Sequence, residues 1–327
     1  MKVVSTVLAR DEGDVIDAQV AFHLNAGVDF VIATDNNSRD GTTEILEAYA
    51  RDGVLHLIRE SAEGLRQGEW VTRMARLAAT EYEADWVINT DADEFWWPRG
   101  GSLQEVLAAV PDSYGVVQAF WRSFVPRPDD GSFFAERMTV RLSQLAPIND
   151  PTSFYRPVVK VAHRADPQVT VARGNHALAS SGQRTLTTWH PIEVMHFPLR
   201  SRAQWMRKVE LQGDAFTKHI ERSGTGYHLK GYDALHSGRI EQQHASLVVS
   251  DQALSRGLAE GSLVLDTRLR DALRRLRAGD PLDFPAPTLA EEAEYAVEAA
   301  VLTEAYTVRA QRDLDDIEQR LHSLESQ

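Results

Sequence analysis

The regular alternation of short apolar runs with amphipathic segments in the first 121 residues constrains the fold more than any other feature of the sequence. Continuous apolar runs predict strands at residues 3–8, 30–34, 54–58, 86–90 and 115–121. Apolar residues at three- and four-residue spacing predict helices at residues 15–26, 42–51, 70–82 and 102–109. Ser102 and Glu105 have the spacing of a capping box at the start of the last of these helices. This order of elements is typical of an α/β fold with a mainly parallel sheet and helices on both faces.

After residue 126 the sequence changes character and predicts a smaller, mixed region. It predicts a proline- and glycine-containing loop at 126–131, strands at 138–142 and 158–163, and a helix at 201–221. Residues 224–238 are rich in glycine, tyrosine and histidine and are predicted as a loop or mobile lid. One or two helices are predicted after the proline-rich stretch 281–287, with Leu314, Ile317, Leu321 and Leu324 at three- and four-residue spacing. An amphipathic helix that packs on its own domain is the favoured interpretation, and a homodimer through these helices is the alternative.

Composition excludes several classes of function. The net charge of −13 opposes binding to nucleic acid or to anionic membranes unless a local basic patch exists. Five arginines between residues 268 and 277 alternate with leucines at helical spacing, and are predicted to form a solvated helix face rather than a docking patch. The chain has no cysteine, so any metal site must use oxygen and histidine ligands. No apolar run is long enough for a transmembrane segment and the N-terminus lacks a signal-peptide layout, so we expect a cytoplasmic protein.

Polar residues follow three of the predicted strands at the point where each strand ends. These are Ala9, Arg10, Asp11 and Glu12 after the first strand, Asp35 to Ser38 after the second, and Asp91 to Glu94 after the fourth. Ligands bind outside the carboxyl ends of the strands in open α/β sheets, so we expect these residues to lie together at one edge. Each stretch taken alone could also be a solvated loop with a helix cap.

Asp91 and Asp93 are the strongest candidates for a metal site. In extended backbone, alternate side chains point to the same face, so the two carboxylates could converge on one Mg²⁺ or Mn²⁺ ion. An Asp-x-Asp pair is a weak signal by itself because it arises often by chance. Here it ends a strand, residues 85–90, that is too apolar to be a surface loop, and this favours a functional site.

With these motifs the chain resembles the nucleotide-diphospho-sugar transferases of glycosyltransferase family 2, in particular a bacterial branch with an Asp-x-Asp-Glu-Phe motif. The resemblance covers the first third of the chain. It is carried by Arg10-Asp11-Glu12, by residues 23–28, by Asp35 with residues 38–42, by Trp86, and by Asp91-Ala92-Asp93-Glu94-Phe95. It implies the GT-A fold, a nucleoside-diphosphate sugar, such as a UDP-sugar, as donor, and Mn²⁺ or Mg²⁺ as the metal. It also implies a catalytic domain at residues 1–222, with a nucleotide-binding part at 1–122 and an acceptor and metal-completing part at 123–222, followed by a lid loop and a helical region at 223–327.

The resemblance also assigns roles to single residues. Asp35 would hold the uracil or ribose, Asp93 would bind the metal that bridges both phosphates, and Asp91 would lie near the ribose or on the metal through water. Ala9, Arg10, Glu12 and Asn37 are placed around the nucleotide, although Asn36 and Asn37 stand where the family has an acid and a glycine. Arg66 and Gln67 either contact the diphosphate or belong to a solvated loop. His196 either completes the metal site, as a late histidine does in related enzymes, or is a core histidine; Lys208 matches a lysine in the branch's following helix.

The reaction implied is displacement at the anomeric carbon with inversion, which needs a base for the acceptor hydroxyl. Glu193, His176 and Asp150 are the candidates for this base, and His176 could instead contact phosphate or sugar. Trp96 and Trp97 either stack on a sugar ring or belong to the core. The acceptor could be a saccharide, a lipid-linked glycan, a natural product or a peptide.

Two other functions fit the same residues. A sugar-phosphate nucleotidyltransferase would use a similar sheet with paired carboxylates, but the first strand is not followed by a glycine-rich phosphate loop with a basic residue. A non-catalytic sugar-nucleotide-binding or scaffold protein would keep the Asp-x-Asp motif without turnover. The absence of Gly-x-Gly-x-x-Gly and of a Gly-Lys-Ser/Thr loop argues against a dehydrogenase and a P-loop enzyme.

Overall fold

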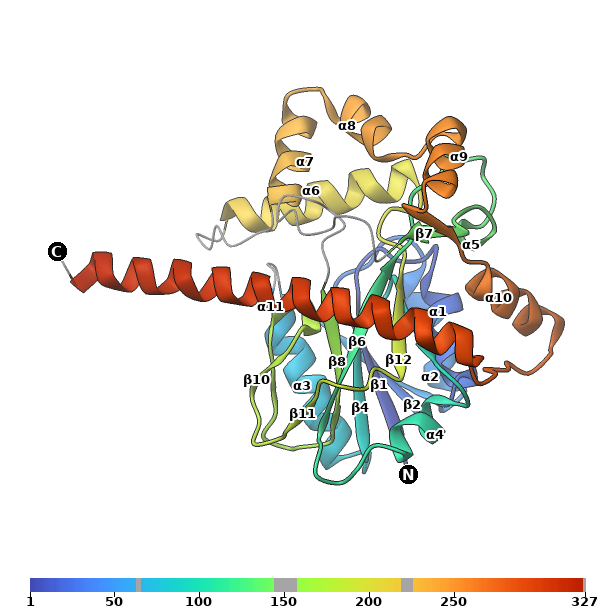
Figure 1. Ribbon diagram of the computed structural model, residues 1–327, viewed down its shortest axis with the longest axis vertical. Helices are drawn as coiled ribbons and strands as arrows, with labels where there is room; N and C mark the ends of the chain where they lie inside the picture. The colour runs from blue at the N-terminus through green and yellow to red at the C-terminus, as the bar shows by residue number, and fades with distance from the viewer. Residues whose placement is uncertain (63–65, 144–157, 219–225, 326–327) are drawn as a thin grey trace.

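A nine-stranded sheet forms the centre of the molecule in the computed structural model, which describes residues 1–62, 66–143, 158–218 and 226–325 (Figure 1). The strand order is β3-β2-β1-β4-β8-β6-β12-β5, and β11 lies beside β6. The strands are β1 Val3–Ala9, β2 Phe30–Asp35, β3 Leu55–Arg59, β4 Trp86–Asp91, β5 Glu94–Pro98, β6 Val116–Ser123, β8 Val159–Arg164, β11 Thr185–Leu186 and β12 Ile192–His196.

The sheet is mainly parallel. β3, β2, β1 and β4 run parallel, as do β6, β11 and β12, whereas β8 is antiparallel to both β4 and β6, and β5 is antiparallel to β12. The predicted α/β class is therefore confirmed. The reversal at β8 brings the second half of the chain back into the same sheet, so the two predicted parts of the domain share one set of backbone hydrogen bonds.

Helices cover both faces of the sheet. The buried residues of α1, α2, α4 and α10 share one core cluster with β1, β2 and β12, and those of α3 form a second cluster on the other side of β1, β2 and β4. Leu302 of α11 packs on Phe120 of β6 and Val159 of β8. These helices are α1 Ile16–Asn25, α2 Thr42–Arg51, α3 Gln67–Thr80, α4 Leu103–Ala108, α10 Arg268–Ala278 and α11 Leu289–Glu325.

The remaining elements are not part of this sheet. They are α5 Phe134–Arg137, β7 Val140–Leu142, β9 Thr170–Val171, a 3₁₀ turn Arg173–Asn175, β10 Leu178–Ser180, α6 Arg202–Lys218, α7 Gly226–His236, α8 Ile240–Leu247, α9 Asp251–Ala259 and β13 Leu263–Leu265. β13 pairs with β7, so backbone hydrogen bonds cross the predicted domain boundary at residue 222.

The elements of the first 121 residues agree with the prediction to within a few residues, and the Ser102 capping box is present. Two predictions fail. β5 is not among the predicted strands, because the acidic motif at its start is interpreted from sequence as the beginning of a loop. Residues 226–236 form α7 rather than a lid, and residues 224 and 225 lie outside the described part of the chain. Gly231 permits close helix packing, since a Cβ atom there would approach a methyl group of Val209 in α6 to 2.9 Å.

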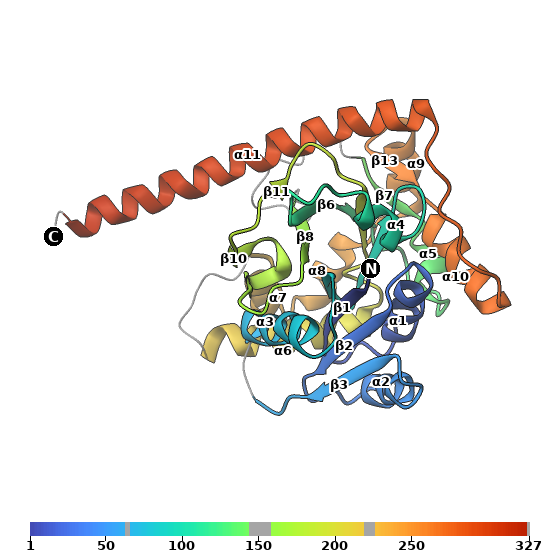
Figure 2. The same ribbon diagram turned by 90° about the horizontal axis from the view of Figure 1, so that it is seen from below.

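The last helix has two different halves. Its first half crosses the domain, and its second half extends beyond it (Figures 1 and 2). Arg270 and Arg274 of α10 form ion pairs at the surface, as expected for a solvated face, whereas Arg268 pairs with the buried carboxylates of Glu193 and Asp266. Within the described residues, no helix is both long and apolar enough to cross a membrane.

Candidate functional site

The carboxyl ends of β2, β1 and β4 place the three predicted polar stretches side by side. In the sheet register, Ala9 is opposite Asp35 of β2, and its neighbour Leu8 is opposite Asp91 of β4. Asp35 and Asp91 are thus separated by a single strand. The structure therefore brings together at one edge the residues that the sequence placed there.

The Asp35 side chain is buried, and hydrogen bonds from the residues that follow it fix its orientation. Its carboxylate accepts hydrogen bonds from the Thr43 hydroxyl (2.5 Å) and from the backbone N–H of Ser38 (3.2 Å). Asn37 adopts the left-handed conformation (φ 57°), and its amide donates to the Ser61 carbonyl at 3.2 Å. Asparagine tolerates this conformation better than most residues, so it can replace the glycine that the family uses here.

Asn36, which directly follows β2, connects the loops that follow β1 and β3. Its amide nitrogen donates to the carbonyls of Glu60 (3.1 Å) and Ala62 (3.0 Å), and its amide oxygen accepts from the Arg10 guanidinium (3.1 Å). A carboxylate at this position could not donate these two hydrogen bonds. The asparagine that departs from the family motif therefore connects three loops of the site.

The backbone of the Asp-x-Asp motif is not extended, which corrects the expectation from its spacing. Residues 92 and 93 form a tight turn between β4 and β5, so the carboxylates of Asp91 and Asp93 enter different surroundings. Among the described residues, no group of three or more acidic or histidine side chains is arranged to hold a metal ion.

Asp91 lies among amide and ammonium donors. One carboxylate oxygen accepts from the Lys160 ammonium (2.7 Å), and the other accepts from the amides of Gln67 (3.3 Å) and Asn175 (3.2 Å). The Gln67 amide oxygen in turn accepts from the backbone N–H of Gly174 (2.9 Å). Gln67 therefore connects Asp91 to the 173–176 turn.

Glu94 and Lys160 form a buried ion pair beneath this edge. The Lys160 ammonium is 2.9 Å from the Glu94 carboxylate, which also accepts from the Trp121 indole N–H (2.8 Å) and the Asp91 backbone N–H (3.1 Å). Burial raises the pKa of Glu94 to about 7, against the opposing effect of Lys160. Burial favours the neutral form of Lys160, but Asp91 and Glu94 outweigh it and raise the pKa of the ammonium. Lys160 thus stays charged and neutralises the acidic edge from below.

Asp93 lies among cations next to His196. Its carboxylate is 2.8 Å from the Lys208 ammonium, 3.8 Å from the Arg200 guanidinium and 3.7 Å from Nε2 of His196. Burial would raise the pKa of Asp93, but Lys208 and Arg200 lower it well below its usual range. The Asp93 carbonyl accepts from the Phe197 backbone N–H (2.9 Å), and His196 is opposite Glu94 in the register of β12 and β5. Backbone pairing therefore holds His196 beside Asp93.

His196 is held as a neutral, oriented imidazole. Burial lowers its pKa to about 4, although the neighbouring Asp93 acts in the opposite direction. Its ring stacks on the Trp121 indole with centroids 4.2 Å apart and an angle of 9° between planes. A neutral imidazole can bind a metal ion, and carboxylates are ligands that Mn²⁺ and Mg²⁺ prefer, so these two side chains could hold a divalent cation together.

Glu12, in the loop after β1, has Arg200 as its ion-pair partner. Arg200 forms an ion pair with Glu12 and a two-pronged pair with Asp14, with both nitrogen–oxygen distances to Asp14 at 2.8 Å. Arg200 itself is 2% exposed. It therefore joins the loop after β1 to the segment after β12 and adds positive charge next to Asp93.

Glu193 is not part of this edge. It lies three residues before His196 on β12, and its buried carboxylate pairs with Arg122 (2.6 Å) and Arg268 (2.8 Å). Burial would raise the pKa of Glu193, but these arginines hold it well below its usual range. A carboxylate stabilised in this way is a weak base, and three residues of strand separate it from His196 by about 10 Å. The structure therefore does not place Glu193 where an acceptor base is needed.

His176 is the base candidate that lies beside the site. Its Nδ1 is 2.8 Å from the Val159 carbonyl, so Nδ1 carries the proton and Nε2 is the basic nitrogen of the neutral ring. The ring meets the Trp121 indole edge-on, with centroids 5.6 Å apart. Trp121 thus lies between His176 and His196. Asp150 falls outside the described residues.

The other predicted residues have different positions. Arg66 is exposed and pairs with Glu69 (3.8 Å) on the surface of α3. Trp96 and Trp97 are buried in the core, Trp97 against Phe22 and Phe284. The solvated-loop interpretation of Arg66 and the core interpretation of the two tryptophans are the ones that the structure supports.

Lys160 and Trp121 are site residues that the sequence patterns do not predict. Lys160 carries a usable signal, because it is a charged residue within the otherwise apolar run 158–162. Trp121 ends a predicted strand next to β12, but nothing in its local sequence indicates that it touches two histidines. Such a contact depends on the order of strands in the sheet.

Residues 13–165, a little under half of the chain, match the model of glycosyltransferase family 92. The matched model is, like the predicted family, one of glycosyltransferases, although the family named differs from the family 2 resemblance of the motifs. No curated protein sequence matches the chain.

Three similar solved structures differ in how much of this chain they cover. Glucosyl-3-phosphoglycerate synthase from Mycobacterium tuberculosis, in complex with Mn²⁺, UDP and glucosyl-3-phosphoglycerate, is 17% identical over 50% of this chain and 57% of its own, with a TM-score of 0.30. A mycobacterial protein is 21% identical over 37% and 41%, with a TM-score of 0.27. Residues 1–349 of TarS from S. aureus, in complex with UDP, are 12% identical over 86% and 92%, with a TM-score of 0.34. The chain thus spans about half the length of the synthase, and at these TM-scores the likenesses carry no conclusion about this chain.

Proposed function

We propose that the protein transfers a sugar from a uridine diphosphate sugar to an acceptor hydroxyl, in a reaction that depends on Mn²⁺ or Mg²⁺ and inverts the anomeric centre. The observation that carries the proposal is the pair formed by Asp93 and His196, with 3.7 Å between carboxylate oxygen and Nε2. At nucleotide sites Mg²⁺ is usually bound by one or two carboxylates together with phosphate oxygens and water, so Asp93 with a neutral imidazole would leave most of the coordination shell to the diphosphate.

The other residues at this edge of the sheet would bind different parts of the donor substrate. Asp35 and Asn37, at the end of β2, would bind the uracil and ribose, with Ala9, Arg10 and Glu12 around the nucleotide, as the resemblance implies. Asp91 would lie between the ribose and the metal. Its carboxylate is already neutralised and oriented by Lys160, Gln67 and Asn175. Lys208 beside Asp93 would contact the diphosphate, and the buried Arg200 adds positive charge next to it.

Charge development on the leaving group determines the mechanism. Asp93 and His196 would hold the metal, whose positive charge would stabilise the negative charge that appears on the leaving nucleoside diphosphate. Lys208 contributes a further positive charge from the protein, and its side chain is 22% exposed at the site. His176 would accept the proton of the acceptor hydroxyl on Nε2, because its Nδ1–H is held by the Val159 carbonyl.

Incubation with a panel of nucleotide sugars and Mn²⁺ tests the proposal, with release of free UDP, GDP or TDP as the readout. We expect UDP release from one or a few UDP-sugars, and loss of that release in Asp93→Asn and His196→Ala. Release of pyrophosphate from a nucleoside triphosphate and a sugar phosphate would instead identify a nucleotidyltransferase. Metal-dependent UDP binding with no turnover of any donor would identify a sugar-nucleotide-binding protein.

A further inference from the structure

Helix α11 carries one unbroken stripe of exposed residues at strict three- and four-residue spacing, hereafter the α11 stripe. It consists of Ala293, Ala296, Ala300, Thr303, Thr307, Ala310, Leu314 and Ile317. These positions are the a and d positions of a heptad repeat. The helix packs on its own domain through a neighbouring face, with Tyr295 and Leu302 buried, so the α11 stripe is left uncovered.

The size of the stripe residues changes along the helix. They are small where α11 crosses the domain and large where it projects past it (Figures 1 and 2). Leu314 and Ile317 are 54% and 52% exposed. Exposed isoleucine and leucine on a helix without a domain beneath it are unusual in a monomer, because single helices gain most of their stability from packing of an apolar face.

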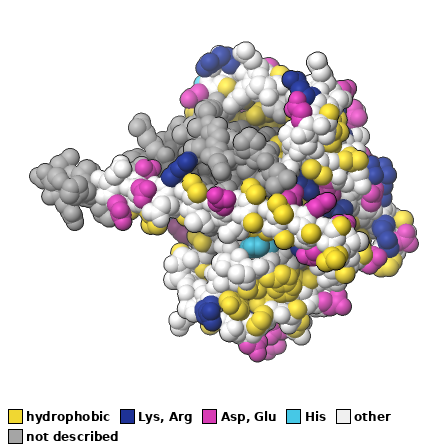
Figure 3. Space-filling model, in the orientation of Figure 1, with side chains coloured by type: hydrophobic (Ala, Val, Ile, Leu, Met, Phe, Trp, Pro, Cys, Tyr) yellow, Lys and Arg dark blue, Asp and Glu magenta, His cyan; other side chains and the backbone are white. Residues whose placement is uncertain are grey.

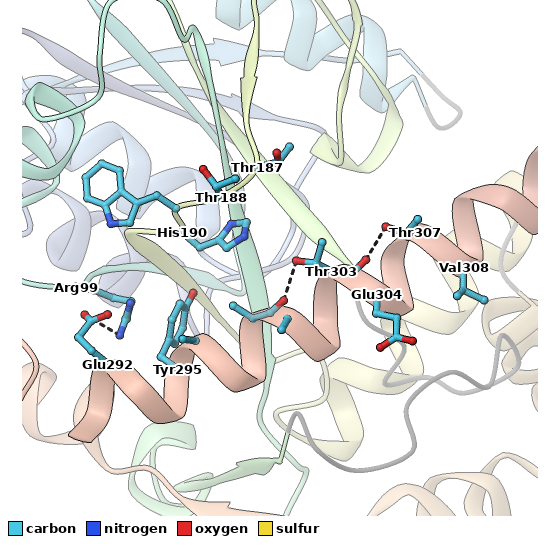
Figure 4. A pocket seen from close by; sticks show the side chains of 14 residues that line it. Arg99, Thr187, Thr188, His190, Glu292, Tyr295, Thr303, Glu304, Thr307 and Val308 are labelled. Carbon is cyan, nitrogen blue, oxygen red and sulfur yellow. Dashed lines mark hydrogen bonds and ion pairs between the residues drawn. The ribbon is translucent and has the colours of Figure 1, made fainter. Parts of the chain in front are cut away.

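A groove of about 670 Å³ lies beside the small part of the stripe (Figure 4). One wall is α11, and the other is the segment before β12 with Trp189 and His190. The hydroxyls of Thr303 and Thr307 donate to carbonyls one turn back in the helix, at 2.7 and 2.8 Å. Their hydrogen-bonding needs are thus met within α11, so these threonines contribute methyl groups to the groove. In the space-filling view, hydrophobic side chains lie on and beneath this part of the helix (Figure 3).

The groove also contains an unsatisfied polar group. The Tyr295 side chain is 8% exposed, lines the groove, and has a hydroxyl without a hydrogen-bond partner among the described residues. Arg99 covers its ring from 3.4 Å and pairs with Glu292 (3.2 Å), which rigidifies this wall. The groove therefore has one rigid wall and a largely apolar lining.

We propose that two copies of this chain form a symmetric dimer through antiparallel α11 helices, with the projecting end of each helix in the groove of the other copy. In an antiparallel pair, a positions meet d positions. Leu314 of one copy then packs against Thr303 of the other, Ile317 packs against Ala300, and the twofold axis passes between residues 308 and 309. Leu314 and Ile317 thus face small residues at both ends of the pair, and Thr307 faces Ala310 near the twofold axis, so no layer sets two large residues against each other. A parallel pair would set large residues against large ones at one end and leave both grooves empty.

Sedimentation velocity tests the association. We expect a mass twice that of the 36.5 kDa chain. The double variant Leu314→Glu/Ile317→Glu should be a monomer with an unchanged melting transition of the domain, because both side chains are exposed. Leu258→Glu on α9, which is 40% exposed, is the matched control and should remain a dimer. A monomeric wild type, or a double variant that remains a dimer, would overturn the proposal.

Disulfide trapping tests the orientation, since the chain has no cysteine of its own. Thr303→Cys and Leu314→Cys proteins, mixed and mildly oxidised, should form a cross-linked dimer, whereas neither should do so alone. In the antiparallel register, position 314 of one copy and position 314 of the other are separated by about 11 residues along the axis, or about 16 Å, which is beyond disulfide reach. Efficient cross-linking of Leu314→Cys by itself would show a parallel pair and refute the arrangement.

Discussion

The substitution Glu193→Gln tests whether the Glu193 carboxylate stabilises the fold or takes part in catalysis. In the structure, Glu193 is buried between Arg122 and Arg268, at 2.6 and 2.8 Å. Arg122 keeps Glu298 (3.0 Å) and Arg268 keeps Asp266 (2.7 Å) as second partners when Glu193 is lost. Loss of one partner from a buried ion pair costs about 3–5 kcal/mol, and the remaining partners favour the lower end, so we expect Glu193→Gln to lose about 3 kcal/mol of unfolding free energy.

The same variant should remain an active enzyme. Removal of a general base lowers turnover by about 10²–10⁴, whereas a residue that only stabilises the fold leaves kcat nearly unchanged at a temperature where the protein is folded. Urea unfolding gives the stability, and UDP release from the donor found in the panel gives the turnover. Glu136→Gln is the control, because Glu136 pairs with Arg274 at the surface and should cost less than about 1 kcal/mol.

The pH dependence provides an internal check. The pKa of Glu193 is lowered in the folded state. The contribution of its carboxylate to the free energy of unfolding is therefore complete above about pH 4.5 and is lost as the pH falls further. The stability difference between wild type and Glu193→Gln should therefore shrink only below about pH 4.5. A large loss of turnover with unchanged stability would show that Glu193 acts in catalysis and would refute this reasoning.

Three further predictions concern the site and the core. Asp35→Asn should weaken UDP binding about tenfold in calorimetry, because a carboxylate acceptor of about 1–2 kcal/mol is lost at the nucleoside end. Lys208→Met should weaken UDP binding more than uridine binding, since only the diphosphate meets the ammonium; equal effects on both ligands would contradict this. Burial lowers the pKa of His23 to about 4 from 6.5, so its neutral form stabilises the fold above pH 6.5 by up to about 3 kcal/mol, and this is lost as the pH falls toward 4. His23→Gln should reduce by about one the protons taken up on unfolding in that window, measured against wild type because His163 and His196 titrate there too.

The strand and helix order of the first 121 residues was predictable because each element carries its own periodicity. Ala9, Asp35 and Asp91 could be placed at one edge for the same reason: in a parallel sheet, the carboxyl ends of neighbouring strands must meet. Sequence spacing did not predict the turn at residues 92 and 93. A two-residue spacing fits both an extended strand and a tight turn, and only the pairing of β5 with β12 selects the turn.

Contacts between distant segments account for the rest of the differences. The Glu193 carboxylate is held by arginines at residues 122 and 268, and His176 lies beside the site because it contacts Val159 of β8 and Trp121 of β6. The glycines of α7 resemble loop glycines until Gly231 is seen against α6. The heptad of α11 was visible only from Leu314 onward, because its first part consists of alanine and threonine, which carry no apolar periodicity signal of their own.

Calorimetry of UDP binding with Mn²⁺ and with a chelator tests the central claim most directly. Asp93 and His196 should make binding depend on the metal, so we expect measurable affinity with Mn²⁺ and none with the chelator. Asp93→Asn should lose the Mn²⁺-dependent affinity while unfolding cooperatively, and Asp112→Asn, at an exposed acid paired with Arg164 far along the chain, should keep it. Equal UDP affinity with Mn²⁺ and with the chelator, or full affinity in Asp93→Asn, would contradict the account.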